Sequence, residues 1–339
     1  MRNLVFSIAP LLLAASLPTL TFAEDPTARA TSPATTGVAY RGVSASMWAE
    51  INAQRSSFGD TNDCQARVNA IPTSGGVTLQ PGADINAALK ANSLVFLSAG
   101  TYKLAGTIRL EAGKKLIGVS GQTVTIDASA VEQAVWIRDN AVLANVSIRD
   151  AIDIGLNFVG SSAGSSNALA YQVSVGRTGL SAVPNDGGIG IIITQGASAN
   201  CVVSTEVFDS WNEVGQSATT ANGGNADGYS MSNGAHHNTL IDSHSYRNGD
   251  DGFDTWEGGV AYFYFCSAFD IGKTTGKTIT GDGNGFKLGR GNVRHYLYKT
   301  SAYRNKSHGF NMNGNSVAPV RVKSDAFANG QLDFQGVDR

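Results

Sequence analysis

Short apolar runs separated by small polar residues fill the chain from Leu94 onward. The runs are rich in Val, Ile and Leu, and Gly, Asn, Asp or Ser stands between them. Examples are LVFL (94–97), TIRL (107–110), TVTI (123–126) and NVSI (145–148). Runs of this kind are typical of short β-strands joined by turns. No helical period follows them, so we expect an all-β region.

Two segments before this region have a helical pattern. We predict one helix around 45–54 and another over 83–90, where Ile85 and Leu89 share one side and an acidic residue stands near the start.

Glycine–aromatic pairs recur along the second half of the chain. They stand at 228–229, 252–253, 285–286 and 309–310, with spacings of 24, 33 and 24 residues, and a further 24 residues reach Phe334. A second aromatic column is spaced by 23, 34 and 24 residues and consists of Tyr246, Phe269, Tyr303 and Phe327. Both columns contain the same long interval, which indicates an enlarged turn within 270–282. A similar insertion is expected within 212–222.

A repeat of this length, built from several short strands, predicts a parallel β-helix in which each repeat forms one coil. Parallel connections are overwhelmingly right-handed, so we expect a right-handed parallel β-helix as the single domain over 41–339. Phe253, Phe286 and Phe310 should stack inside it. A leucine-rich repeat has a comparable period, but its leucine and asparagine pattern is absent. The 83–90 helix is expected to cap the first coil and shield its strand edges.

Three aspartates lie within five positions in the stretch NGDDGFDTW (248–256), although only 15% of the residues are charged. In a β-helix, equivalent positions of neighbouring coils lie about 4.8 Å apart. The repeat therefore brings Asp227 and Asp250 close to Asp251 and Asp254, with Lys287 one coil further on. Separately solvated carboxylates are the alternative, but four so close favour a bound hard cation. Calcium suits them best because it accepts many oxygen ligands in flexible geometry.

Three motifs carry a resemblance to a known family. NGGNADGY (222–229), NGDDGFD (248–254) and GDGNGFKLG (281–289) resemble, in this order, the family 9 polysaccharide lyases, which are secreted pectate lyases on a right-handed parallel β-helix. The resemblance implies that Asp227, Asp250, Asp251 and Asp254 bind calcium. It also implies that Lys287 is the catalytic base.

The expected reaction is β-elimination on a uronic-acid polymer, most directly polygalacturonate, with 4,5-unsaturated products. Lys287 would remove the proton beside the substrate carboxylate, which calcium neutralises. Calcium, burial and Arg290 would lower the pKa of Lys287, whereas Asp254 would raise it. The alternative for Lys287 is a structural ion pair with Asp254. Arg290 is the candidate for binding a substrate carboxylate.

Two other functions remain open at this stage. A polygalacturonase-like glycoside hydrolase shares the fold and uses two carboxylates around a water, which the Asp motifs superficially match. It would leave Lys287 without a role. A non-catalytic, calcium-stabilised carbohydrate-binding β-helix is the third possibility, and it needs no lysine beside the metal.

The chain termini and composition bear on location and partners. A net charge of −2 and a pI of about 6.2 do not indicate a nucleic-acid partner. Residues 1–23 resemble a signal peptide, with a basic start, an apolar run and a small-residue cleavage site, and 24–40 form a polar leader. No later stretch is long enough to span a membrane. We expect a secreted monomer that binds an acidic polysaccharide.

Three cysteines permit at most one internal disulfide. Cys201 and Cys266 lie in apolar, strand-like runs, so we expect both to be reduced and buried.

Overall fold

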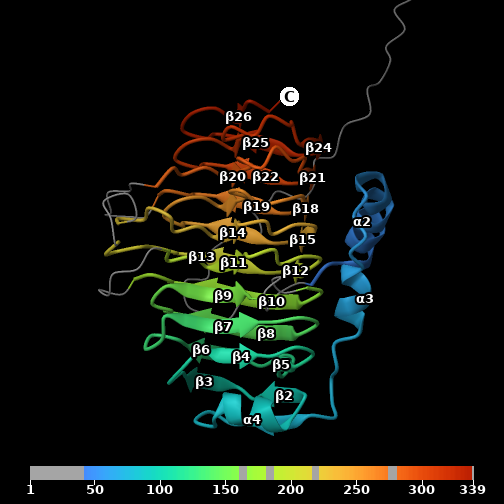
Figure 1. Cartoon of the computed structure of the whole chain (residues 1–339), viewed down its shortest axis with the longest axis vertical. Coiled ribbons are helices and arrows are strands. Elements are labelled where there is room, and N and C mark those ends of the chain that lie inside the picture. Colours follow the sequence, from blue (N-terminus) through green and yellow to red (C-terminus); the bar gives the residue numbers. More distant parts are fainter. Residues whose placement is uncertain (1–41, 160–165, 181–186, 216–220, 274–280, 338–339) are drawn as a thin grey trace, which may run out of the picture. The chain divides into compact units, whose positions relative to one another are not determined.

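Two parallel sheets form the body of the protein in the computed structural model, which describes residues 42–159, 166–180, 187–215, 221–273 and 281–337. The predicted signal peptide and leader lie outside the described residues, as do parts of both predicted insertions. Among the described helices, none is long and apolar enough to cross a membrane. All strand pairings within the two sheets are parallel, as the repeat predicts, and Figure 1 shows the coils stacked from β2 to β26.

The larger sheet contains two strands from most coils. Its strands are β1 (Val77–Leu79), β2 (Leu94–Leu97), β3 (Gly100–Lys103), β5 (Lys115–Gly118), β6 (Val124–Asp127), β8 (Val142–Arg149), β10 (Leu169–Gly176), β12 (Cys201–Val203), β13 (Glu206–Phe208), β15 (Asn238–Ile241), β16 (His244–Tyr246), β18 (Ala261–Tyr264), β19 (Ser267–Phe269), β21 (Tyr296–Tyr298), β22 (Ser301–Tyr303), β24 (Val320–Val322) and β25 (Asp325–Phe327).

The smaller sheet takes one strand from each coil and positions the candidate site. Its strands are β4 (Ile108–Leu110), β7 (Gln133–Ile137), β9 (Ile154–Phe158), β11 (Ile191–Ile193), β14 (Tyr229–Met231), β17 (Phe253–Asp254), β20 (Phe286–Lys287), β23 (Phe310–Asn311) and β26 (Phe334–Gln335).

The first aromatic column forms a ladder inside the coils. Tyr229, Phe253, Phe286, Phe310 and Phe334 pair in register on successive strands. Their ring centroids follow at 4.6, 4.6, 4.9 and 5.5 Å, with nearly parallel planes. The ladder packs in the core cluster of Leu, Ile and Val side chains. The predicted register and the buried Phe stack are therefore confirmed.

The second aromatic column is also in register, but it lies outside this core cluster. Arg247 and Arg304 follow its rings, cover them and bind Asp209 and Asp270 through two nitrogens each. These arginines are therefore occupied in structural contacts.

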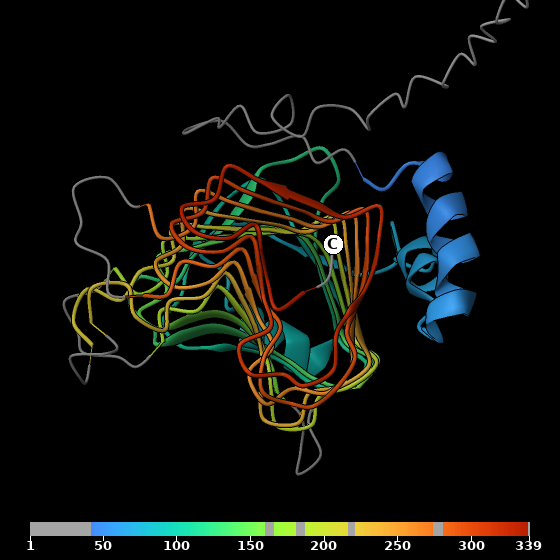
Figure 2. The same cartoon turned by 90° about the horizontal axis from the view of Figure 1, so that it is seen from above.

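Three helices occur early in the chain: α2 (Ala45–Phe58), α3 (Cys64–Asn69) and α4 (Ile85–Ala91). Asp84 caps α4 by accepting a hydrogen bond from the Ala87 backbone, and Ile85 and Leu89 pack into the core. The predicted cap is confirmed, and α4 lies at the β2 end of the stack (Figure 1). Seen from above in Figure 2, α2 lies outside the coils.

The helix α3 is absent from the sequence prediction, and it changes the cysteine assignment. Cys64 at its start forms a disulfide with Cys201 on β12, so the prediction of a reduced Cys201 is wrong. The partners are 137 residues apart, and only the packing of the helices on the larger sheet brings them together. Cys266 is buried and free, as predicted.

The aromatic ladder gives a stability test. Phe286 is fully buried, whereas Phe327 in the outer column is 41% exposed. We expect Phe286→Ala to lower the free energy of unfolding by about 3–5 kcal/mol, because it removes ring contacts on both sides and leaves a cavity. Phe327→Ala should cost much less. Denaturant unfolding of both variants checks this, and equal losses of unfolding free energy would contradict a larger contribution of the inner ladder to stability.

Candidate active site

Adjacent coils of the smaller sheet bring the candidate site residues together. Asp254 pairs in register with Ser230 on one side and with Lys287 on the other. Gly252 allows this close approach, because a Cβ there would lie 2.5 Å from the Gly285 carbonyl oxygen. A bulkier residue would push apart the coils that carry the carboxylates and the lysine.

Three of the predicted carboxylates form one buried group. Ligand oxygens of Asp227, Asp251 and Asp254 all lie within 4.8 Å of one another. Asp251 Oδ1 accepts hydrogen bonds from the backbone and side-chain nitrogens of Asn284, both at 2.8 Å. Asp227 Oδ1 accepts one from the Asp251 backbone at 3.1 Å. These bonds fix two carboxylates relative to each other.

Asp250 is held differently from the other three. Its two carboxylate oxygens accept hydrogen bonds from the backbone nitrogens of Asp282 and Asn225. Its oxygens group with those of Asp251 and Asp282. The structure therefore places Asp250 beside the predicted metal group, with a second role in ordering the turn before β20.

Lys287 reaches into the carboxylates from β20. Its Nζ lies 2.9 Å from Asp251 Oδ2, 3.3 Å from Asp254 Oδ2 and 3.0 Å from Asp282 Oδ2. The ion pair with Asp254 raised by the sequence is present, within a larger network. Asp282 was missed by the sequence reasoning, although its place in GDGNGF, five residues before Lys287, is a usable signal.

The site holds more negative than positive charge. Burial and the neighbouring carboxylates raise the pKa of Asp227 and Asp250 well above the ordinary range. Burial raises the pKa of Asp254 to about 7, although Lys287 opposes the shift. Burial disfavours the Lys287 ammonium, but Asp251 and Asp254 outweigh that effect and raise its pKa. The carboxylates thus need further positive charge to stay ionised together.

A calcium ion fits this donor set. Two carboxylate oxygens, Asp254 Oδ1 and Asp251 Oδ2, are buried without a hydrogen-bond partner, and Asp251 Oδ2 has only the ion pair with Lys287. Oxygen-only donors that are buried, clustered and negatively charged match the ligands that calcium prefers. Within the described residues, the candidate metal groups contain aspartates alone.

Arg290 and Trp256 lie beside the lysine. The Arg290 guanidinium stacks 4.0 Å from the centre of the Trp256 ring, and Lys287 Nζ lies 5.5 Å from the same centre. Arg290 is exposed, so its donors remain accessible to solvent. This contact places it at the edge of the site, where the sequence analysis expects a substrate carboxylate.

A buried histidine, His295, is linked to the Lys287 backbone through Thr255. Thr255 Oγ1 lies 3.3 Å from His295 Nε2 and donates to the Lys287 carbonyl oxygen at 3.2 Å. Burial lowers the pKa of His295 to about 4, so the ring is neutral near pH 7. No motif marks His295, because its role depends on a contact between side chains of neighbouring coils that are 40 residues apart in the sequence.

Comparison with known proteins agrees with this architecture. Residues 68–339 match the family model described as Pel9A-like, right handed beta helix region. The chain belongs to this Pel9A-like family. The predicted fold, including its right hand, and the suspected family are therefore confirmed.

Relatives of this Pel9A-like chain are named as lyases. Pectate lyase L of Paenibacillus polymyxa (strain SC2) is 24% identical over 267 residues, which cover 71% of this chain and 57% of the relative. Pectate lyase L of Dickeya dadantii (strain 3937) is 27% identical over 147 residues, 42% of this chain and 33% of the relative. The chain thus spans between a third and somewhat over half of these relatives.

Two solved structures share the fold of this Pel9A-like chain. The crystal structure of pectate lyase Pel9A has a TM-score of 0.65 at 20% identity, covering 79% of this chain and 73% of that one. A rhamnogalacturonan lyase has a TM-score of 0.57 at 17% identity and covers 74% of each chain. The protein is therefore built on a β-helix of the polysaccharide-lyase type.

The charge imbalance predicts how stability depends on pH. Carboxyl groups with raised pKa hold protons more tightly in the folded than in the unfolded state, so stability falls as pH rises between the two values. With chelator present, we expect the melting temperature to fall from about pH 4 to pH 7, the Asp254 value. Added Ca²⁺ should remove this fall, and scanning calorimetry checks both curves.

A matched control separates the site from other acids. Asp227→Asn should flatten the chelator curve, whereas Asp325→Asn, at an exposed position of β25, should leave it unchanged. Identical chelator curves for native protein and Asp227→Asn would contradict the assignment.

Proposed function

We propose that the protein is a calcium-dependent polysaccharide lyase that cleaves a uronic-acid polymer, most directly polygalacturonate, by β-elimination. One observation carries the proposal: a single amine, Lys287 Nζ, contacts the carboxylates of Asp251 and Asp254 from the neighbouring coil. The relatives named pectate lyase support the reaction class.

Each group has a defined task. Asp227, Asp251 and Asp254 would hold the ion, and Asp250 orders the turn that carries Asp282 and also lies close enough to contribute. Bound calcium supplies positive charge that neutralises the substrate carboxylate and makes the adjacent C–H bond more acidic.

Lys287 carries out the proton transfer. The neutral form of its amine would take the proton at C5, and the electron pair left there would form the C4–C5 double bond. The C4–O bond would break with its electron pair on the oxygen of the leaving chain, which takes up a proton from solvent. Thr255 donates to the Lys287 carbonyl oxygen and also contacts His295, and these contacts fix the backbone from which the lysine side chain extends. Arg290 would bind a further substrate carboxylate, with its guanidinium oriented by Trp256.

The two alternatives fit the geometry less well. A hydrolase that places water between acid and base needs carboxyl groups about 6.5–9.5 Å apart. Asp227, Asp251 and Asp254 are closer than that, within 4.8 Å of one another. A non-catalytic β-helix would not need a lysine that is largely buried among the candidate ligands of the metal.

We also propose that the protein is secreted and acts as a monomer. The Cys64–Cys201 disulfide supports export, because such bonds persist in oxidising compartments. One chain supplies all the described site residues, so no second copy is needed to complete the site.

Substitution of Lys287 tests the function directly. We expect Lys287→Ala to abolish the ultraviolet-absorbing unsaturated product formed from polygalacturonate. Lys287→Arg should fail as well, because a guanidinium stays protonated and cannot accept the proton. The rate loss should exceed about 10²-fold, the usual contribution of a general base.

Calcium titration calorimetry provides the control for this experiment. Lys287→Ala should still bind Ca²⁺, whereas Asp251→Ala should bind it more weakly than Asp325→Ala does. Substantial unsaturated product from Lys287→Ala would assign the base elsewhere. Reducing sugar without that absorbance from the native protein would favour the hydrolase.

A further inference from the structure

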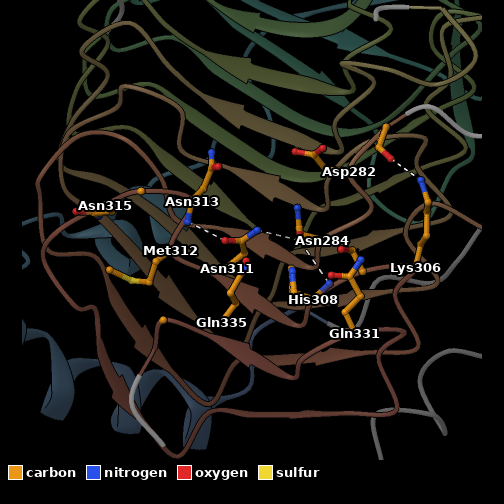
Figure 3. Close-up of a pocket in the computed structure, with 14 residues that line it drawn as sticks. Asp282, Asn284, Lys306, His308, Asn311, Met312, Asn313, Asn315, Gln331 and Gln335 are labelled. Atoms are coloured by element: carbon orange, nitrogen blue, oxygen red, sulfur yellow. Dashed lines mark hydrogen bonds between the residues drawn. The ribbon is translucent and has the colours of Figure 1, made fainter.

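A polar hollow of about 850 Å³ adjoins Lys287 on the side of the last coils. Figure 3 shows amide side chains from successive coils around it. Those that matter here are Asn284, Asn311, Gln331 and Gln335, with His308 among them.

The hollow is continuous with the candidate active site. Asn311 follows Lys287 in register, and Gln335 follows Asn311. Asn284 connects the two regions, because its side chain donates to Asp251 and accepts from Asn311 at 3.2 Å. Each step along the stack is about 4.8 Å, close to the length of one pyranose unit. A polymer that extends from Lys287 along the stack toward the last coils would place its next units here.

The two basic side chains that line the hollow, Lys306 and His308, each make a hydrogen bond within the protein. Lys306 Nζ donates to the Gly281 carbonyl oxygen at 2.7 Å. His308 Nδ1 accepts a hydrogen bond from the Leu332 backbone at 3.2 Å. Asp282 adds a carboxylate at the boundary with Lys287. Among the described residues that line the hollow, no other side chain is basic.

Amides suit uncharged sugars better than uronates. A carboxylate is bound most strongly by Arg or Lys. In a site that lacks them, it loses its hydrogen bonds to water and gains no ion pair in exchange. Amide groups both donate and accept, so they match hydroxyl and ester oxygens. Gln331 and Gln335 are exposed, and their side chains make no hydrogen bond to other described residues. Their amides are therefore available to a ligand.

We propose that this hollow binds an uncharged sugar unit next to the uronate from which Lys287 removes the proton. The unit is a neutral sugar or a methyl-esterified uronate, and the two share the same recognition by amides. The inference rests on the proposed lyase function and refines its substrate class: a polymer in which charged and uncharged units adjoin.

A substrate panel tests the inference on the native chain. Unsaturated product is measured with polygalacturonate, with its partly methyl-esterified form and with a backbone that alternates galacturonate and a neutral sugar. We expect a higher kcat/KM on at least one substrate with uncharged units than on polygalacturonate. The better of those two substrates identifies the source of the uncharged unit.

A charged residue introduced into the hollow provides a second test of the proposed subsite. Gln335→Lys should lower the KM for polygalacturonate roughly two- to fivefold, the scale of one exposed ion pair. Gln335→Glu should raise it. Thr101→Lys is the matched control, because this exposed position on β3 adds the same charge far from the hollow, and it should leave KM unchanged.

The outcomes separate the two claims. Best activity on polygalacturonate, with the same KM in Gln335→Lys as in Thr101→Lys, overturns the uncharged subsite. The lyase function stands in that case, provided that the product still depends on Lys287. Absence of unsaturated product from all three substrates overturns the lyase function, and the subsite inference with it.

Discussion

In-register stacking of parallel coils is the constraint on which the rest of this structure depends. Each coil repeats its pattern one strand spacing further along, so residues at equivalent positions form columns. The inner aromatic ladder fixes this register, since a slip of one residue would turn the rings outward. Site geometry and core packing are therefore determined together.

The columns show two ways in which stacked charges are accommodated. Outside the larger sheet, acidic and basic residues alternate from coil to coil, so neighbouring coils attract each other. The ion pairs are Asp150 with Arg177, Asp209 with Arg247 and Asp270 with Arg304. At the candidate site the column instead repeats carboxylates in a buried setting, and Lys287 balances only part of the charge. An arrangement that costs stability in this way is typical of a functional site.

Much of the site follows from the repeat, and the rest depends on contacts that the repeat does not encode. Register alone brings Asp227, Asp251, Asp254 and Lys287 together, which is why the sequence predicts them. The Cys64–Cys201 disulfide was missed because a helix outside the repeat carries one partner. The direction of the Lys287 pKa shift also could not be read from the sequence, because burial and four carboxylates act against each other and only distances decide the balance.

The central claim is that the clustered aspartates and Lys287 act as one calcium-dependent base site. The most direct measurement is the ultraviolet absorbance of unsaturated ends formed from polygalacturonate by the native chain, first with chelator and then after Ca²⁺ is restored. We expect no product with chelator and full recovery when calcium is restored, because without calcium the carboxylates keep Lys287 protonated. Undiminished product in excess chelator would contradict it.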